Sequence, residues 1–339
     1  MKIGILGSGT MGISIAHFTA KNNCLTVVYD NSKENIKSSK INLFKLLDKL
    51  NDKGKYTKED IKKIKKNLTF STDIKSLKSS ELIIEAIIEN LDLKKDIFSK
   101  IEKLVNEKCI ISSNTSSLSI TALASSLEKS ERFIGLHFFN PANLMPLVEI
   151  IPAIQTKKII TEKCKKFLEK FGKVVVLAKD TPGFIVNRVA RPFYGEAIRI
   201  YEEGIASIET IDWAMKELGG FRMGPFELMD FIGNDVNYKV TETVFEQFYF
   251  DSRYKPSFSQ KKLMEAGYFG RKSGKGFYDY SSKNQPEVSK NRELGKTIVI
   301  RILSMLINEA ADALYLNIAS KEDIDLAMTK GVNYPKGLL

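Results

Sequence analysis

A serine, a histidine and a glutamate of one stretch have the residue types that a proton-transfer site needs. The run Ser113-Asn114-Thr115-Ser116-Ser117 is followed about twenty residues later by His137-Phe138-Phe139-Asn140-Pro141, and Glu149 comes soon after. Together they offer hydroxyl donors, an imidazole base and a carboxylate that can orient the base. The chain has one other histidine, His17, which falls on an expected helix where a packing role suffices. His137 is therefore the candidate for proton transfer.

A glycine-rich turn near the start of the chain predicts a dinucleotide site. The apolar strand 2–6 runs into Gly7-Ser8-Gly9-Thr10-Met11-Gly12, and a helix begins directly after it. This is the context that the GxGxxG motif requires. Gly7 permits the tight turn, Gly9 lets a pyrophosphate approach the backbone, and Gly12 lets the helix pack on the strand. The amino end of the helix then faces the phosphates.

A carboxylate at the end of the second strand indicates which dinucleotide binds. The strand 25–29 is followed by Asp30, eighteen residues after Gly12. A carboxylate at this place accepts hydrogen bonds from both hydroxyls of the adenosine ribose, and its charge disfavours a 2′-phosphate. We therefore predict NAD rather than NADP as the cofactor.

The first half of the chain alternates strands and helices. We expect strands at 68–70, 82–88, 109–112, 147–151 and 174–177, with helices over 91–105 and 161–171. This alternation predicts an α/β fold with a parallel, Rossmann-like doubly wound sheet. Ligands of such a sheet bind at the carboxyl ends of the strands, so Glu89, Asn114 and Ser116 are expected at the nicotinamide side. Ser116 and Ser117 are equally well explained as caps of a helix that begins near Ile120.

A lysine-rich segment, about 31–66, interrupts the alternation. Apolar residues at helical spacing on either side of a break at 51–54, with Thr57 as a cap, predict a helical arm inserted into the nucleotide-binding domain. Such lysines contribute much of the formal charge of +11. They fit a solvated surface or an arm that binds a phosphorylated substrate. A nucleic-acid partner is not expected, because the sequence lacks a recognisable binding module or an arginine-aromatic pattern.

Composition argues against several other classes. No run approaches the eighteen apolar residues of a membrane span, and the first residues have the pattern of a strand rather than of a signal peptide. We therefore expect a cytoplasmic protein that does not interact with membranes. Cys24, Cys109 and Cys164 show no CxxC spacing, so neither a disulfide framework nor a thiolate metal site is predicted.

The chain changes character at Asp180-Thr181-Pro182-Gly183-Phe184, where proline and glycine make a linker. We predict an NAD-binding domain over 1–183 and an all-α C-terminal domain over 184–283. An internal repeat follows, in which a set of residues recurs at one constant offset. Glu196-Ala197, Ala206-Ser207, Ile211-Asp212, Ala214-Met215 and Gly224 recur as Glu309-Ala310, Ala319-Ser320, Ile324-Asp325, Ala327-Met328 and Gly337. This predicts a partial second copy of the helical domain over 291–339.

The motifs, taken in order, resemble those of the L-3-hydroxyacyl-CoA dehydrogenase family, including 3-hydroxybutyryl-CoA dehydrogenases, over essentially the whole chain. They are GSGTMG, EAIIEN, SNTSSL, GLHFFNP, LVEI, DTPGFIVNR, GPFELMD and GRKSGKGFYDY. The resemblance implies reversible, NAD-dependent oxidation of an (S)-3-hydroxyacyl-CoA with a short acyl chain to a 3-oxoacyl-CoA. The pathway stays open between fatty-acid β-oxidation, butanoate synthesis and aromatic breakdown.

The resemblance also implies roles for individual residues. His137 is the acid and base, Glu149 orients it, and Ser116 and Asn187 contact the substrate. The cofactor site includes Asp30, Glu89, Lys94, Asn140 and Lys272. A lysine of the arm, at about Lys53, meets the phosphates of coenzyme A. In the blander alternatives, Asn187 bonds its own backbone at a helix start and the arm lysines are plain surface.

Two other functions stay open at this point. One is a dehydrogenase of the same fold that acts on a free hydroxy acid or sugar acid. The other is a non-catalytic cofactor-binding protein of the lens-crystallin type, against which the presence of Ser116, His137, Glu149 and Asn187 argues. In the resembled family, single-copy helical domains pair between subunits, whereas two copies can pack within one chain. We predict a homodimer.

Overall fold

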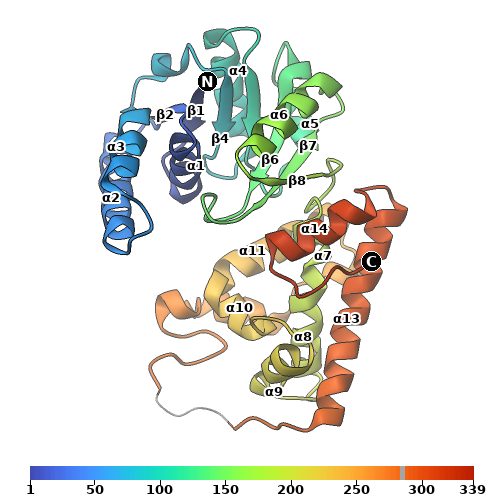
Figure 1. Cartoon of the computed structure of the whole chain (residues 1–339). Helices are drawn as coiled ribbons and strands as arrows, with labels where there is room; N and C mark the ends of the chain where they lie inside the picture. The colour runs from blue at the N-terminus through green and yellow to red at the C-terminus, as the bar shows by residue number, and fades with distance from the viewer. Residues whose placement is uncertain (283–286) are drawn as a thin grey trace. The chain divides into compact units, whose positions relative to one another are not determined.

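The computed structural model describes residues 1–282 and 287–339, and the chain divides into two compact units, Met1–Asp180 and Thr181–Leu339 (Figure 1). Each unit is described by itself. The domain boundaries expected from the sequence, 1–183, 184–283 and 291–339, are finer than this division and stay predictions.

An eight-stranded sheet forms the centre of the first unit, in the order β3-β2-β1-β4-β5-β6-β7-β8. The order in which strands are added reverses between the parallel neighbours β1 and β4, as in a doubly wound fold, so the predicted Rossmann-like class is confirmed. The strands are β1 (Lys2–Leu6), β2 (Leu25–Tyr29), β3 (Leu68–Ser71), β4 (Leu82–Glu85), β5 (Ile110–Ser113), β6 (Phe133–Phe138), β7 (Leu147–Pro152) and β8 (Val174–Leu177). The flanking helices are α1 (Thr10–Lys21), α4 (Leu91–Leu104), α5 (Ile120–Ala124) and α6 (Lys158–Lys170).

The sheet is mostly parallel, as predicted, but one pair of strands is antiparallel. β6 and β7 are antiparallel, whereas the other neighbours in the sheet are parallel. The connection between them, 139–146, is shorter than the dozen or more residues that a parallel crossover requires. β7 therefore runs back directly beside β6.

Strand β4 is also shorter than its apolar run predicts. It ends at Glu85 rather than Ile88. The Glu85 carboxylate accepts a hydrogen bond from the backbone N–H of Ile87, 2.6 Å from N to Oε1, which turns the chain away from the strand direction. The expected core is present upstream of this turn, where Ile83 and Ile84 are fully buried. β4 is a central strand that is buried on both faces, and its sequence Leu82-Ile83-Ile84-Glu85 is accordingly almost continuously apolar.

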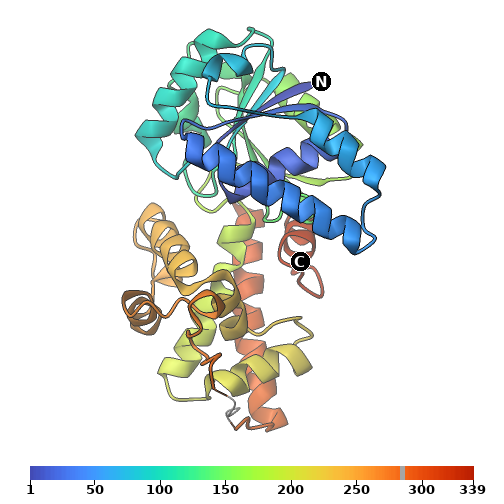
Figure 2. The same ribbon diagram turned by 90° about the vertical axis from the view of Figure 1, so that its left-hand side faces the viewer.

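The lysine-rich segment is a helical hairpin, as predicted. α2 (Lys33–Asp52) and α3 (Lys58–Asn67) lie side by side (Figures 1 and 2). Thr57 caps α3 in a reciprocal capping box with Asp60. Leu43 and Leu47 are buried, while the lysines of both helices face outward or lie partly exposed.

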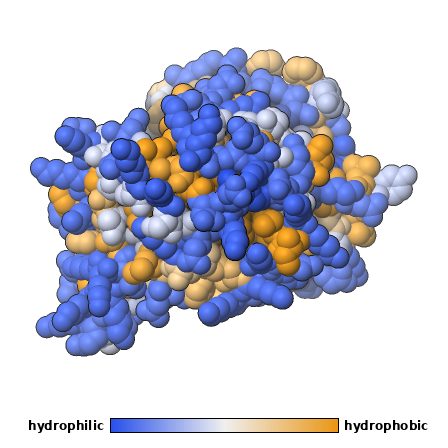
Figure 3. Space-filling view, turned by 90° about the horizontal axis from the view of Figure 1, so that it is seen from above, coloured by the Kyte–Doolittle hydropathy of each residue, from blue (hydrophilic) through white to orange (hydrophobic). Residues whose placement is uncertain are grey.

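Seen from above, hydrophilic side chains cover most of the surface, with apolar patches between them (Figure 3).

The second unit is built from helices. They are α7 (Val186–Val189), α8 (Arg191–Glu202), α9 (Ile208–Trp213), α10 (Pro225–Ile232), α11 (Asn234–Gln247), α12 (Phe258–Glu265), α13 (Arg292–Tyr315) and α14 (Lys321–Gly331), with a π-helical turn at Ala214–Leu218. The predicted all-α class of the C-terminal part is confirmed. Among the described residues, no helix is long and apolar enough to cross a membrane.

The internal repeat appears in the packing of these helices. α8 and α13, which carry the matching residues Glu196 and Glu309, pack against each other. Arg188 donates to Glu309 and Arg301 donates to Glu196, each at 2.6 Å from Nε to the carboxylate. The arginines are related by the same offset as the glutamates. The two copies therefore exchange equivalent ion pairs across an approximate twofold arrangement within the chain.

Candidate active site

His137 and Glu149 meet because of the antiparallel pair of strands. They lie directly opposite each other in the register of β6 and β7, so their side chains project from the same face of the sheet. His137 Nδ1 lies 2.6 Å from Glu149 Oε2. His137 is 6% exposed and Glu149 is fully buried. The antiparallel pairing of β6 and β7 is thus what builds the predicted dyad.

The chemistry of this contact fixes the tautomer of the histidine. An ionised carboxylate can only accept a hydrogen bond, so the proton between the two side chains belongs to Nδ1. Nε2 of a neutral His137 then carries a lone pair and can take a proton from a ligand. Glu149 also stabilises the imidazolium that results. The Phe139 ring packs against the imidazole with the ring centroids 4.6 Å apart, which further restricts its orientation.

The loops after β4 and β5 join next to this dyad. Asn114 accepts a hydrogen bond from the backbone N–H of Phe138, 2.8 Å from Oδ1, and so ties the end of β5 to the end of β6. Glu89 Oε1 accepts from the hydroxyl of Thr115, the backbone N–H of Ser116 at 3.1 Å and the hydroxyl of Ser117 at 3.0 Å. The serine-rich turn is therefore folded around one carboxylate.

The interpretation of Ser116 and Ser117 as helix caps is wrong. Ser119 caps α5 instead, with its hydroxyl accepting from the N–H of Ala122. The turn that holds Ser116 is thus shaped by Glu89, not by the helix that follows.

A buried ion pair that sequence reasoning missed lies beneath Glu89. Lys94 is 1% exposed, and its Nζ lies 2.5 Å from Glu85 Oε1 and 3.2 Å from Glu89 Oε2. Glu85 also accepts from the hydroxyl of Ser113 at 2.6 Å. Burial raises the pKa of Glu89, but Lys94 and the hydroxyl donors outweigh burial and lower it overall. Lys94 therefore keeps Glu89 ionised, and Glu85 keeps Lys94 in place.

The glycine-rich turn has the shape that a dinucleotide requires. Gly7 has φ +98°, and a Cβ there would lie 2.6 Å from the carbonyl oxygen of Ala86, so only glycine fits. A Cβ on Gly12 would lie 2.0 Å from the carbonyl oxygen of Gly7. Gly9 faces open space, with no atom within 4 Å of an added Cβ. The turn is thus close-packed on one side and open where a pyrophosphate would approach.

The start of α1 differs from the starts of the next four helices. α2, α3, α4 and α5 are each capped by a side chain, from Ser32, Thr57, Asn90 and Ser119. α1 begins after Gly9 and has no side-chain cap. Its first N–H groups and the positive end of its dipole are therefore left for an anion, as the NAD prediction requires.

Asp30 stands at the end of β2 beside this turn. Its Oδ2 accepts from the N–H and the hydroxyl of Ser8, at 2.9 and 2.8 Å, and its Oδ1 accepts from the N–H of Ser32 at 3.0 Å. Burial raises the pKa of Asp30, but these hydrogen bonds outweigh burial and lower it overall. The carboxylate is therefore ionised at neutral pH and suited to ribose hydroxyls.

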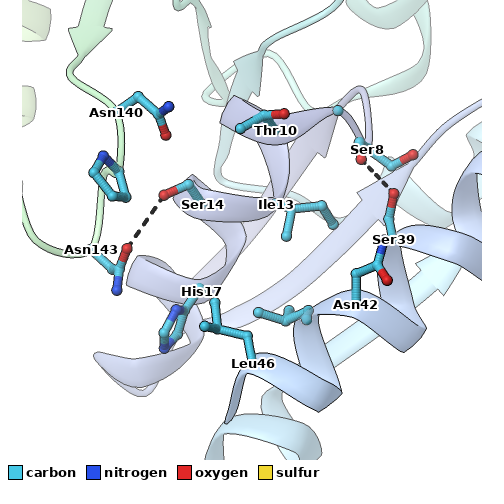
Figure 4. Close-up of a pocket in the computed structure, with 13 residues that line it drawn as sticks. Ser8, Thr10, Ile13, Ser14, His17, Ser39, Asn42, Leu46, Asn140 and Asn143 are labelled. Atoms are coloured by element: carbon cyan, nitrogen blue, oxygen red, sulfur yellow. Dashed lines mark hydrogen bonds between the residues drawn. The ribbon is translucent and has the colours of Figure 1, made fainter. Parts of the chain in front are cut away.

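A cavity of about 430 Å³ opens beside the turn. The close-up in Figure 4 shows that its walls come from the glycine-rich turn, from α1, from the arm helix α2 and from the loop after β6. The labelled residues around it include Ser8, Thr10, Ser39, Asn42 and Asn140. The cavity thus joins the predicted cofactor turn, the arm and the loop that follows His137.

Three predicted site residues, Lys53, Asn187 and Lys272, do not line the cavity described above. Lys53 is exposed and caps the carboxyl end of α2, directly after Asp52. Asn187 is on α7 of the second unit, and Lys272 is in the same unit, where its Nζ lies 2.6 Å from Asp235 Oδ1. Their roles in the site stay predictions. The described residues contain no group of three or more His, Cys, Asp or Glu that could hold a metal ion.

Comparison with known proteins bears directly on this site. The model for the NAD-binding domain of 3-hydroxyacyl-CoA dehydrogenase matches residues 2–181, and the model for the C-terminal domain matches residues 183–280 and 298–339. The second C-terminal match falls on the partial repeat. The predicted NAD cofactor is thereby confirmed.

Similar proteins agree with these matches. The chain is 34% identical to the 3-hydroxyadipyl-CoA dehydrogenase of Escherichia coli (strain K12), over 99% of this chain and 89% of that protein. It is 40% identical to a probable 3-hydroxybutyryl-CoA dehydrogenase of Deinococcus radiodurans, over 83% of this chain and 100% of that protein. The crystal structure of 3-hydroxybutyryl-CoA dehydrogenase from Escherichia coli K12 superposes with a TM-score of 0.95 at 33% identity, covering 100% of this chain and 90% of that one. The chain therefore belongs to the 3-hydroxyacyl-CoA dehydrogenase family of NAD-dependent oxidoreductases.

Proposed function

We propose that the protein interconverts a short-chain (S)-3-hydroxyacyl-CoA, such as 3-hydroxybutyryl-CoA, and the corresponding 3-oxoacyl-CoA, with His137 as the acid and base. The observation that carries this proposal is the buried contact of 2.6 Å between His137 Nδ1 and Glu149 Oε2. It supplies an imidazole whose Nδ1 faces a buried carboxylate, and that carboxylate orients the ring and stabilises the imidazolium.

In the oxidation, the bond between hydrogen and the C3 oxygen breaks and the proton moves to His137 Nε2. NAD, when bound, would accept the hydrogen on C3 as a hydride, and the C3 hydroxyl would become a ketone. In the reduction, the imidazolium returns its proton to that oxygen. General acid-base catalysis of this kind contributes roughly 10²- to 10⁴-fold. Ser116 and Asn187 are proposed to donate hydrogen bonds to the reacting oxygen or to the thioester carbonyl and so position it.

The cofactor and substrate are proposed to occupy neighbouring parts of the first unit. NAD would lie over the uncapped start of α1, with Asp30 at its adenosine ribose and Glu89, Asn114 and Asn140 toward the nicotinamide. The cavity of Figure 4 supports a place for the substrate, because it runs from the loop after His137 to the arm. Its arm side is apolar at Leu43 and Leu46, which suits the linear chain of a CoA thioester.

One lysine of the arm is proposed to meet the phosphates of coenzyme A, with Lys53 as the candidate. Lys53→Ala should raise KM for acetoacetyl-CoA by a few-fold, as expected of an exposed charge pair, and leave kcat nearly unchanged. Lys62→Ala, on the exposed side of α3, is the matched control. Equal KM values for the two variants would mean that Lys53 is plain surface.

The experiment that tests the proposed function follows NADH absorbance with acetoacetyl-CoA and, separately, with free acetoacetate. We expect fast oxidation of NADH with the thioester alone, and much slower oxidation of NADPH because of Asp30. Turnover of the free acid alone would instead favour a hydroxy-acid or sugar-acid dehydrogenase. Tight NADH binding without any turnover would favour a non-catalytic binding protein.

A cytoplasmic homodimer stays the proposed state of the protein. The face of α8 that packs on α13 is occupied within the chain, so a dimer has to use another surface. Light scattering at micromolar concentration tests this proposal, and a monomer alone would contradict it.

A further inference from the structure

Three hydrogen bonds connect the arm to the predicted ribose carboxylate through the glycine-rich turn. The hydroxyl of Ser39, on α2, donates to the backbone carbonyl of Ser8 at 2.6 Å (Figure 4). The N–H and hydroxyl of Ser8 both donate to Asp30 Oδ2, at 2.9 and 2.8 Å. Ser8 is 2% exposed. The turn that would receive NAD is therefore bonded on one side to Asp30 and on the other to the arm.

Ser39 occupies the face of α2 that lines the cavity. Ser39, Asn42, Leu43 and Leu46 follow one another at intervals that place them on one side of a helix, and all four line the cavity. A helix moves as a rigid element over two turns. The contact between Ser39 and the glycine-rich turn therefore sets where Asn42, Leu43 and Leu46 stand.

We propose that Ser39 is a positioning residue that couples the binding of NAD at the glycine-rich turn to the binding of the acyl-CoA thioester along α2. This inference rests on the proposed function. NAD bound at the turn fixes the backbone of Ser8, and through Ser39 it fixes the cavity wall that the thioester contacts. Such coupling is reciprocal, so the thioester strengthens NAD binding by the same factor.

Other contacts hold the arm in place without Ser39. The hydroxyl of Tyr56 lies 3.2 Å from His17 Nε2, and the side-chain amide of Asn67 donates to the carbonyl of Ala20 at 3.0 Å. Both join the arm to α1. Removing the Ser39 hydroxyl should therefore leave the arm folded and attached, and should change chiefly how the two ligands affect each other.

The neighbouring residue gives a matched control. Ser38 is exposed, and its hydroxyl donates to the carbonyl of Asn35 within α2, at 3.1 Å. Ser38→Ala removes the same group from the same helix without touching the glycine-rich turn. Ser39→Thr, which keeps a hydroxyl at the position, should restore coupling lost in Ser39→Ala.

The test is calorimetric titration of acetoacetyl-CoA into the protein, first alone and then with saturating NAD. Both compounds are in the oxidised state, so the pair binds without reacting. The coupling factor is the Kd for acetoacetyl-CoA without NAD divided by the Kd with NAD. We expect a factor above one for the native protein and for Ser38→Ala. In Ser39→Ala it should fall by about two- to tenfold, the equivalent of one hydrogen bond.

Two results would overturn the role of Ser39. One is a coupling factor of one in the native protein. The other is a coupling factor in Ser39→Ala that equals that of the native protein. This holds even if each ligand alone binds more weakly to the variant. A native protein that neither binds acetoacetyl-CoA nor oxidises NADH with it would overturn the proposed function itself, and this result is obtained before any variant is made.

Discussion

His137 and His17 are both buried in the first unit, but they lie on different elements and have different partners. His137 is on β6 and faces the carboxylate of Glu149. His17 is on α1, where its Nε2 lies 3.2 Å from the hydroxyl of Tyr56 and its ring meets the Tyr56 ring edge to face. Burial, and then the charge of Lys21, lower the pKa of His17 to about 4. His17 is therefore neutral at physiological pH.

The difference shows that burial alone does not make a histidine a proton carrier. A buried imidazole that must gain a proton needs a negative partner, because the uncompensated charge is costly in the protein interior. Glu149 supplies that partner to His137, whereas a tyrosine hydroxyl and a nearby lysine do not supply it to His17. We therefore expect substitutions at His137 to act on catalysis and substitutions at His17 to act on stability.

The largest expected effect is on turnover. His137→Gln should lower kcat for NADH oxidation with acetoacetyl-CoA by roughly 10²- to 10⁴-fold, because the acid is lost. NADH binding, followed by fluorescence, should remain. His17→Gln should lower kcat by less than about tenfold, because His17 does not transfer a proton to or from the substrate. Comparable losses of kcat in the two variants would remove the distinction between the histidines.

Next in size is the effect of the carboxylate. Glu149→Gln keeps the size of the side chain but not its charge, so the imidazolium loses a charged hydrogen-bond partner. Such a partner is worth about 1.5–3 kcal/mol, which corresponds to roughly a ten- to hundredfold decrease in kcat. Steady-state kinetics with saturating NADH measures it. A native kcat would mean that Glu149 does not support the histidine.

The effect of His17 should appear as a pH dependence of stability. Its pKa is about 4 in the folded protein and 6.5 in a model peptide. The unfolded chain therefore binds the proton more strongly, and stability is lost as the pH falls from about 6.5 toward 4. Between pH 7 and 5 this amounts to about 2 kcal/mol. Urea unfolding of native protein and His17→Gln at both pH values measures the difference, and an identical pH dependence would contradict it.

The smallest expected effect concerns the partner of His17. Tyr56→Phe removes the hydroxyl and keeps the ring, so the free energy of unfolding should fall by about 0.5–1.5 kcal/mol. kcat should change little, in contrast to Glu149→Gln. A thermal shift assay with parallel kinetics separates these outcomes. A kcat as low as that of Glu149→Gln would show that the two histidine partners are not different in kind.

Much of this arrangement was predictable from local pattern. The glycine-rich turn, Asp30, the capping of the arm by Thr57 and the repeat that pairs Glu196 with Glu309 each depend on spacing along the chain, which the sequence shows directly. Confirmation of the family and of NAD agrees with those motifs. The roles of Ser116, Asn187, Lys53 and Lys272 stay predictions.

Other features depend on pairing between distant segments, which spacing does not show. β7 returns beside β6 because the connection between them, 139–146, is short. This antiparallel pairing places Glu149 opposite His137. The apolar run after Glu85 has the pattern of a continuing strand, but the Glu85 carboxylate turns the backbone at Ile87. The buried pair of Glu85 and Lys94 joins a strand end to a helix. Glu85 opens the EAIIEN motif, but the spacing of the two residues does not show that they pair.

The central claim is that Glu149 acts through His137, and a double variant tests it most directly. Single-turnover oxidation of bound NADH by saturating acetoacetyl-CoA is measured in His137→Gln, in Glu149→Gln and in the protein with both changes. If the two residues act as a unit, the double variant reacts as slowly as His137→Gln and no slower. A further decrease in the double variant, equal to that of Glu149→Gln alone, would contradict the account.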